Sequence, residues 1–373
     1  MSPIKVGFVG LSKSGWASST LATPLLQSDK YTLTAVSTSS KESAEASAAK
    51  YSEITGREVK AYYGNTDQIA NDPNVDFVAI AVKAPLHKEV LMPVIEAGKD
   101  FFIEWPAGKN TEETIQFAEA AKTKGVRSIV GLQGWQAPVI KKIKEIIDSG
   151  KIGKVMSTSA IITLPREVNM WAPVTNEALT YMLVPGEGAT MLDIIIGHQL
   201  GPLTHILGSF RSVSATSAML YPTSTLVSAD GTPTGKTVQN HAKDHYAFNG
   251  ILSSGVFINV VWRGGYKSTP GRHQHIWEID GEEGSIRVTS DEPAGGFFHV
   301  RYPELYLNGE PVELERNGKT DPSGGMLGNV GAAWEEFAKG EEGSYPTIED
   351  AVQLHRLLDA IQLSGETGRR IDL

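Results

Sequence analysis

The chain of 373 residues contains no cysteine, which excludes disulfides, thiolate metal sites and cysteine nucleophiles. It also lacks any run of about 18 uncharged apolar residues, so we expect no membrane span. A strand is predicted almost directly after Met1, so we expect no secretory signal before it, and the cytoplasm is the default compartment. The net charge of −9 argues against a basic surface for nucleic acid, so no direct nucleic-acid binding is expected.

The composition is that of a protein with substantial buried cores. Hydrophobic residues make up 40% of the chain and charged residues 21%, which is typical of globular proteins. The length exceeds that of one ordinary domain. We expect a dinucleotide-binding domain over residues 1–135 and a second domain over residues 136–373.

Apolar strands alternate with amphipathic helical segments in the first part of the chain. The predicted strands are 4–9, 33–37, 59–63, 77–82, 101–104 and 128–131, and the predicted helices are 18–27, 42–51, 87–96 and 111–124. This alternation predicts an α/β domain with a doubly wound parallel sheet of the Rossmann type.

The pattern changes after Pro138. A helix is expected at 139–149, followed by antiparallel strands at 155–163, 212–220, 246–252, 256–262, 275–280 and 285–288. A helix that begins with Ala189–Gly197 interrupts them, and a last helix at 348–364 is expected to pack back on the body. The polar segments 222–238 and 315–328 predict long surface loops. The second domain is therefore expected to be α+β.

The first strand leads into a turn that is typical of a dinucleotide site. Residues 10–15 read Gly-Leu-Ser-Lys-Ser-Gly, which matches G-x-G-x-x-G except for a serine at the middle glycine. Such a turn presents the first free N–H groups of a helix to a pyrophosphate. The residues predicted to bind the cofactor here are Gly10, Leu11, Ser12, Gly15 and Trp16.

The end of the second strand bears on the choice between NAD and NADP. An acidic residue there would bind the ribose diol of NAD, but the sequence offers Ser37, Ser39 and Lys41. Hydroxyls and a lysine suit the 2′-phosphate of NADP, so NADP is favoured and NAD stays possible. A plain polar turn is the alternative interpretation.

Three further strand ends are expected to face the cofactor, because ligands bind beyond the carboxyl ends of parallel strands. His87 either lies near the cofactor, caps the next helix or is a surface residue. The candidates at these ends are Val82, Pro85 and His87, then Glu104, Trp105 and Pro106, and finally Gln133.

The stretch Phe102-Ile103-Glu104-Trp105-Pro106 resembles the Glu-Lys-Pro motif of the Gfo/Idh/MocA family, the group of glucose-fructose oxidoreductase, inositol dehydrogenase and rhizopine catabolism. The proline of that motif is commonly cis. The resemblance covers almost the whole chain. It implies a Rossmann domain followed by a domain with a large, open-faced, mostly antiparallel sheet. Such a sheet usually pairs with a copy of itself, so the resemblance implies a homodimer or higher homo-oligomer.

The resemblance also implies positions for catalytic side chains. Residues 188–198 are similar to the family's Gly-Gly-Gly-x-Leu-x-Asp-x-Gly-x-His helix and keep the histidine as His198, whereas the aspartate position is Ile194. The motif lysine is replaced by Trp105, which carries no acid–base group. His198 is predicted as proton donor or acceptor, with a structural helix-end histidine as the alternative. The pair Asp244 and His245, or Tyr181, is a candidate for the missing acid–base role, and no metal site is predicted.

Three functions follow from these features. The first is an NADP-dependent oxidoreductase acting on a small sugar-like polyol, a cyclic hydroxy compound or a related carbonyl. The second is a dinucleotide-sensing regulator that binds a transcription activator, because Trp105 and the Gly-Trp-Ala turn at Gly15 resemble the fungal branch that includes the galactose-regulon repressor. The third is a non-redox elimination or cyclisation on the same fold.

Overall fold

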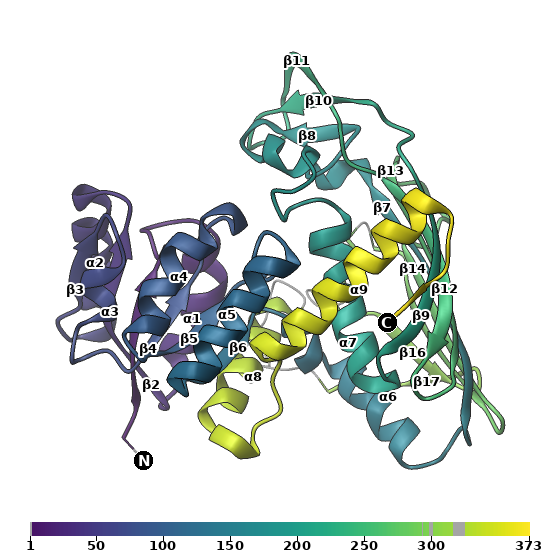
Figure 1. Cartoon of the computed structure of the whole chain (residues 1–373), viewed down its shortest axis with the longest axis horizontal. Coiled ribbons are helices and arrows are strands. Elements are labelled where there is room, and N and C mark those ends of the chain that lie inside the picture. Colours follow the sequence, from purple (N-terminus) through teal and green to yellow (C-terminus); the bar gives the residue numbers. More distant parts are fainter. Residues whose placement is uncertain (1, 293, 298–300, 316–324) are drawn as a thin grey trace. The chain divides into compact units, whose positions relative to one another are not determined.

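The computed structural model describes residues 2–292, 294–297, 301–315 and 325–373. It divides into two compact units (Figure 1). Unit 1 comprises Met1–Gln136 and Asn317–Gln353, and unit 2 comprises Ala137–Arg316 and Leu354–Leu373. Residues 317–353 thus return to unit 1 and residues 354–373 to unit 2, which a single boundary near residue 135 does not capture.

Unit 1 contains a six-stranded parallel sheet in the order β3-β2-β1-β4-β5-β6. The strand order reverses between β1 and β4, and this switch point is where ligands bind in such sheets. The prediction of a doubly wound parallel sheet is confirmed. The strands are β1 (Ile4–Val9), β2 (Tyr31–Thr38), β3 (Lys60–Tyr63), β4 (Phe77–Ile80), β5 (Asp100–Ile103) and β6 (Ser128–Val130).

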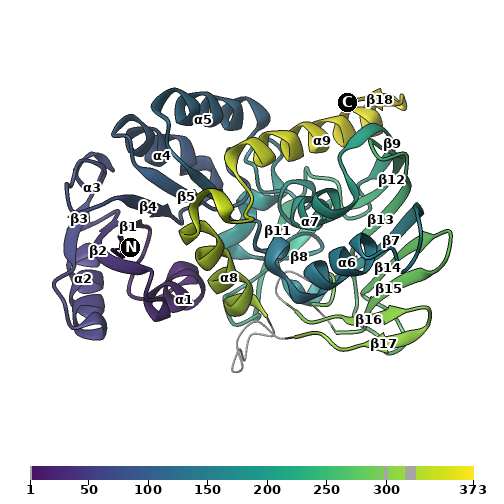
Figure 2. The ribbon, with the colours of Figure 1, turned by 90° about the horizontal axis from the view of Figure 1, so that it is seen from below.

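Helices cover both faces of this sheet, with α4 and α5 on one side and α1 and α8 on the other (Figure 2). A π-helical turn at Ala17–Leu21 continues directly into α1. The short helix α3 was not predicted. The helices of unit 1 are α1 (Ala22–Gln27), α2 (Lys41–Thr55), α3 (Asp67–Ala70), α4 (His87–Glu96), α5 (Thr111–Lys124) and α8 (Met326–Ala338).

Helix α8 completes the core of unit 1 although it is distant in sequence. The ring of Trp334 lies 4.8 Å from that of Phe102 and 6.0 Å from that of Phe77, and the Tyr31 hydroxyl donates to the Trp334 carbonyl at 2.5 Å. The predicted loop 315–328 falls mostly outside the described residues, and from Met326 it is helix.

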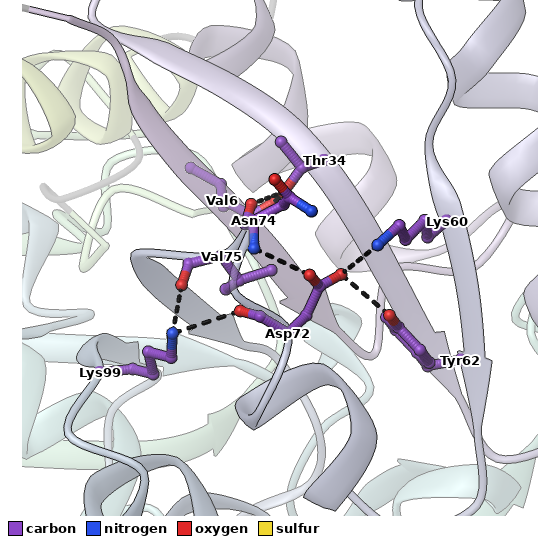
Figure 3. A network of polar contacts seen from close by, with 8 residues as sticks. All are labelled: Val6, Thr34, Lys60, Tyr62, Asp72, Asn74, Val75 and Lys99. Atoms are coloured by element: carbon purple, nitrogen blue, oxygen red, sulfur yellow. Dashed lines mark hydrogen bonds and ion pairs between the residues drawn. The ribbon is translucent and has the colours of Figure 1, made fainter.

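A polar network braces the sheet at the amino ends of its strands (Figure 3). The Asp72 carboxylate accepts from Lys60 Nζ at 3.0 Å and from the Tyr62 hydroxyl at 2.9 Å, both on the edge strand β3. Lys99 Nζ donates to the carbonyl oxygens of Asp72 and Val75 at 3.3 and 2.6 Å. The network therefore stabilises the edge opposite to the expected ligand site.

Unit 2 is built on a nine-stranded sheet in the order β17-β16-β15-β14-β7-β13-β12-β9-β18. Its neighbouring strands are antiparallel except for β7 and β13, which run parallel. The mostly antiparallel sheet predicted for this domain is confirmed, with that pair as a difference. The strands are β7 (Val155–Pro165), β9 (Phe210–Ala218), β12 (His245–Leu252), β13 (Phe257–Tyr266), β14 (His275–Gly281), β15 (Ser285–Ser290), β16 (Glu304–Leu307), β17 (Glu310–Val312) and β18 (Ile371–Asp372).

Helices α6 (Pro138–Asp148) and α7 (Gly197–Leu207) lie against one face of the nine-stranded sheet (Figure 1). Along β12, Tyr246 and Phe248 are buried on that side, whereas Ala247 and Asn249 are exposed on the other. No helix of the described residues covers the second face. Helix α9 (Ile348–Thr367) begins in unit 1 and ends in unit 2. None of the described helices has the length and apolarity needed to cross a bilayer.

The predicted surface loop 222–238 is wrong. It forms the hairpin of β10 (Thr223–Val227) and β11 (Pro233–Gln239), which joins β8 (Val174–Asn176) in a small sheet. Buried and exposed residues alternate along β10, with Ser224 and Leu226 buried and the threonines exposed. The polar composition concealed this alternation in the sequence.

Candidate functional site

Gly10 forms the junction between β1 and the fingerprint turn. Its φ is +84°, and a Cβ at this position would lie 2.2 Å from the Ala81 carbonyl oxygen at the end of β4. Its N–H donates to the Ser37 carbonyl at 2.8 Å. Only glycine fits this position, because three strand ends converge on it.

The fingerprint turn presents backbone donors to solvent. The exposed residues Lys13, Ser14 and Gly15 have N–H groups without an acceptor among the described residues. Gly15 has a φ of +112°, and a Cβ at this position would lie 3.9 Å from the Ser12 hydroxyl oxygen, an ordinary contact. The Ser12 hydroxyl donates to the Ser14 carbonyl, so the serine at the middle glycine stabilises the turn. Free N–H groups ahead of a helix fit the pyrophosphate of a dinucleotide.

Helix α2 holds this turn in place, a support that the sequence did not reveal. The Ser47 hydroxyl donates to the Leu11 carbonyl at 2.5 Å. Lys50 Nζ donates to the Lys13 carbonyl and to the Ser18 hydroxyl, both at 2.9 Å. Ser47 follows Leu11 by 36 residues and Lys50 follows Lys13 by 37, so no local pattern links them to the turn.

The end of β2 offers hydroxyls and a cation but no carboxylate. Ser37 is buried and acts through its carbonyl, whereas Ser39 is exposed. Ser40 caps α2 by accepting from the Ser43 N–H at 3.2 Å. Lys41 is exposed and lies 3.7 Å from Glu45. Of the three residues predicted here, Ser39 and Lys41 are therefore the ones open to a ligand.

The end of β5 carries a half-buried acid that is bonded to a half-exposed indole. Trp16 Nε1 donates to Glu104 Oε1 at 2.7 Å, and burial raises the pKa of Glu104 to about 7. The peptide bond between Trp105 and Pro106 is cis, and Trp105 is buried. A Cβ on Gly131 would lie 2.4 Å from Glu104 Oε2. The sequence did not indicate the bond between Trp16 and Glu104.

His87 joins the turn after β4 to the segment after β5. Its Nδ1 lies 2.9 Å from the Ala107 carbonyl oxygen and its Nε2 lies 3.1 Å from that of Val82. Burial lowers the pKa of His87. Of the neighbouring candidates, Pro85 lies in a one-turn 3₁₀ helix and Gln133 is buried in another. His87 therefore positions the strand ends rather than facing solvent.

His198 lies near the start of α7 in unit 2. Burial lowers its pKa to about 3, so the imidazole is neutral at physiological pH. Asp193 caps the same helical segment by accepting from the N–H and the hydroxyl of Thr190, at 2.9 and 2.7 Å. The carboxylate next to the predicted aspartate position thus has a structural role.

Asp244 and His245 form a contact pair, with 2.7 Å between Asp244 Oδ1 and His245 Nδ1. The N–H of Gly264 donates to the Asp244 carbonyl at 2.8 Å, and a Cβ on Gly264 would lie 3.2 Å from Met191 Sδ. This pair is therefore close to the start of the helical segment that contains His198. Tyr181 lies in a 3₁₀ turn at Glu177–Leu183, and burial raises its pKa.

Metal ligands do not cluster in the parts of the chain that the structure describes. No group of three or more His, Asp or Glu side chains there could hold an ion.

The chain matches two family descriptions. Residues 4–132 match the "Oxidoreductase family, NAD-binding Rossmann fold", GFO_IDH_MocA. Residues 138–290 match the C-terminal domain of Gal80p. The boundary between the two matches lies close to residue 135.

Curated relatives include both an enzyme and a regulator. The dehydrogenase aclE of Aspergillus oryzae is 30% identical over 98% of this chain and 97% of its own length. The galactose/lactose metabolism regulatory protein GAL80 of Saccharomyces cerevisiae is 25% identical over 100% of this chain and 94% of its own. The levoglucosan dehydrogenase of Pseudarthrobacter phenanthrenivorans is 26% identical over 58% of this chain and 56% of its own.

Solved structures confirm the fold. A super-repressor mutant of Gal80p from Saccharomyces cerevisiae superposes with a TM-score of 0.87, at 23% identity, covering 100% of this chain and 98% of that one. With nearly complete coverage by an enzyme relative at 30% identity, the chain belongs to the Gfo/Idh/MocA oxidoreductase family and carries an NAD-binding Rossmann fold and a domain of the Gal80p C-terminal type.

Proposed function

We propose that unit 1 binds NADP in preference to NAD, at the carboxyl edge of its parallel sheet. The fingerprint turn carries this proposal, because Lys13, Ser14 and Gly15 offer free N–H groups at a helix start. Leu11, Ser12 and Gly10 form the base of that turn, while Val82, Pro85, His87 and Gln133 complete the surrounding strand ends. Ser39 and Lys41 would receive the 2′-phosphate, since no carboxylate occupies the end of β2.

We propose that Trp16, Glu104, Trp105 and Pro106 form the wall of the same site toward the reactive ring of the cofactor. The Trp16 indole is 49% exposed, so one face is open to an aromatic ligand. Its Nε1 is fixed by Glu104, which sets the plane of the indole. A flat, preorganised aromatic surface favours stacking of a heteroaromatic ring.

The reaction proposed is oxidation or reduction of a sugar-like or cyclic hydroxy or carbonyl compound. A bound nicotinamide supplies hydride chemistry itself, so the protein has to orient the substrate and move one proton. His198, Asp244, His245 and Tyr181 are the proposed polar groups of unit 2 for these tasks. The relatives aclE, a dehydrogenase, and levoglucosan dehydrogenase support this reaction.

The first experiment is calorimetric titration of the purified protein with NADPH and NADH. We expect selective micromolar binding of NADPH and quenching of Trp16 fluorescence. The variant Ser39→Asp should reverse the preference, because a carboxylate repels a 2′-phosphate and accepts from a ribose diol. Ser43→Asp, one turn into α2, is the matched control. Binding of neither dinucleotide by the wild-type protein would refute the proposal.

A dinucleotide-sensing regulator is the second candidate, and a buried residue favours it. Trp105 follows Glu104 at the strand end but has no titratable group and is 5% exposed. A protein that only senses the cofactor needs no proton donor there. Micromolar dinucleotide binding without turnover in a screen of sugars, polyols and their carbonyl forms would favour this function. Recovery of a transcription activator on the immobilised protein would identify the partner.

We also propose that the protein forms a homodimer through the uncovered face of the nine-stranded sheet. Ile276, Ile161, Val261 and Ala247 lie side by side in register across four strands of that face. Ile161 is 37% exposed, and such an apolar row favours burial against a copy of itself. Ile161→Lys should shift the sedimentation coefficient to that of a monomer, whereas Asn249→Lys on the same face should weaken the dimer less.

A further inference from the structure

Three donors fix the Asp244 carboxylate in the interior of unit 2. Its Oδ1 accepts from the Leu220 N–H at 2.9 Å, and its Oδ2 accepts from the Tyr221 N–H at 2.9 Å. The third donor is His245 Nδ1, 2.7 Å from Oδ1. Asp244 is 2% exposed. Because both oxygens already accept hydrogen bonds from backbone N–H groups, the carboxylate acts as an acceptor toward the imidazole as well.

This arrangement determines which nitrogen of His245 carries the proton. A neutral imidazole that donates from Nδ1 has its lone pair on Nε2. Nε2 lies 3.4 Å from the Tyr266 hydroxyl, so the phenol is the donor in that contact. The ring of His245 packs near two tyrosine rings, with its centroid 6.3 Å from that of Tyr221 and 5.6 Å from that of Tyr266. The imidazole is therefore held in one orientation.

Tyr266 is itself fixed at the end of β13. Gly265 has a φ of +82°, and a Cβ there would lie 2.4 Å from the Tyr221 ring. The Arg272 guanidinium lies 5.0 Å from the centre of the Tyr266 ring and donates to the Lys267 carbonyl at 2.9 Å. A cation over the ring stabilises negative charge on the phenol oxygen. The side chains thus run from the buried Asp244 through His245, 15% exposed, to the half-buried Tyr266.

We propose that Tyr266 is the catalytic residue that exchanges a proton with the substrate, with His245 as its base and Asp244 as a positioning residue. This inference rests on the proposed oxidoreductase function and adds the proton path to it. During oxidation, the substrate hydroxyl proton passes to the phenol oxygen while the phenol proton passes to His245 Nε2. The C–H bond breaks, its hydride leaves to the oxidised dinucleotide, and the C–O bond becomes double. The imidazolium is stabilised by Asp244.

The first test reads the tautomer of His245 and requires no substrate. Long-range proton–nitrogen spectra of the protein labelled with ¹⁵N-histidine distinguish protonation at Nδ1 from protonation at Nε2. The His245→Gln spectrum identifies the signal by its loss. We expect a neutral ring with its proton on Nδ1, and a shift of the Nε2 signal in Tyr266→Phe. A proton on Nε2 in the neutral ring would overturn the relay, because Tyr266 would then be the acceptor.

The second test separates the relay from the proposed function. Tyr266→Phe keeps the ring and removes the hydroxyl, and it should lower kcat about 100-fold while leaving the dinucleotide Kd within twofold. Tyr221→Phe is the matched control, since its ring also faces His245 but its hydroxyl does not bond to it. We expect the control to keep kcat within threefold. Full turnover by Tyr266→Phe overturns only the relay, whereas absence of dinucleotide binding by the wild-type protein overturns the proposed function and the relay together.

Discussion

The fingerprint turn of unit 1 and the Asp244 cluster of unit 2 are built from different material. The turn is made of backbone, with free N–H groups and a glycine that no other residue replaces. The cluster is made of side chains, with Asp244, His245 and Tyr266 joined across β12 and the end of β13. A backbone site requires a local sequence pattern, whereas a side-chain site requires only that distant residues meet.

In the fingerprint turn, the largest loss of stability on substitution is expected at Gly10. In Gly10→Ala the Cβ would lie 2.2 Å from the Ala81 carbonyl oxygen, and the positive φ is strained as well. We expect the free energy of unfolding to fall by about 4 to 5 kcal/mol, from strain and overpacking together. Urea unfolding of the whole protein, monitored by hydrogen exchange of the amides of unit 1, measures this loss.

Gly64→Ala provides the control for that experiment. Gly64 follows β3 with a φ of +82°, but no atom lies within 4 Å of the position of a Cβ. The free energy of unfolding of Gly64→Ala should therefore fall only by the cost of backbone strain, about 1 to 2 kcal/mol. Equal losses in the two variants would show that the contact with Ala81 does not matter.

In the side-chain cluster, the largest effect is expected at Asp244. Asp244→Ala leaves two backbone N–H groups and His245 Nδ1 without their acceptor. We expect unit 2 to lose about 3 kcal/mol, because each buried, unsatisfied donor is costly. Asp230 is exposed and caps the turn between β10 and β11. Asp230→Ala should therefore lower the free energy of unfolding by less than about 1 kcal/mol. A similar dinucleotide affinity in all three proteins would show that the effect stays within unit 2.

The sequence predicted the bounds of those helices and strands whose pattern lies within the element itself. The bounds predicted for β1, α4 and α5 agree with the structure, because each combines a clear hydrophobic period with a turn or a cap. Helix α8 was missed because its role depends on Trp334 packing against Tyr31 and Phe102, on strands far earlier in the sequence. The β10–β11 hairpin was missed because polar residues occupy its exposed positions.

The same distinction applies to the candidate site. Gly10 and Gly15 could be predicted, since a positive φ demands glycine within a short motif. Lys50, Glu104 as the partner of Trp16, and Tyr266 as the partner of His245 could not be assigned these contacts. Each meets its partner through the tertiary fold, between 21 and 88 residues away. The pattern of the sequence does not contain such contacts.

Glu104 offers a pH-dependent test of the fingerprint region. Its pKa is raised from 4.5 to about 7 by burial, so the folded protein binds this proton more tightly than the unfolded chain. The free energy of unfolding should therefore fall as the pH rises from about 4.5 to about 7, and stay level above that. A pKa shift of this size lowers the free energy of unfolding by about 3 kcal/mol over that pH range.

Glu104→Gln removes the titration and keeps an acceptor for Trp16 Nε1. The stability of the variant relative to the wild-type protein should rise by up to about 3 kcal/mol between pH 4.5 and pH 8. Thermal unfolding at a series of pH values measures this difference, and Glu113→Gln, which changes a buried acid on α5, serves as control. Parallel pH curves for the wild-type protein and Glu104→Gln would refute the assignment of Glu104.

The smallest effect is expected for the lysine that supports the turn from α2. Lys50→Met removes the bonds to the Lys13 carbonyl and the Ser18 hydroxyl, which should cost about 1 kcal/mol of stability. The turn would also lose its fixed shape, so the Kd for the preferred dinucleotide should rise about fivefold. Lys60→Met loses its ion pair with Asp72 at the opposite edge of the sheet (Figure 3) and should cost a similar amount of stability with no change in Kd. If Lys50 supports the turn locally, only Lys50→Met raises the Kd. An equal rise of the Kd in both variants would show that general loosening of the sheet is sufficient to weaken dinucleotide binding.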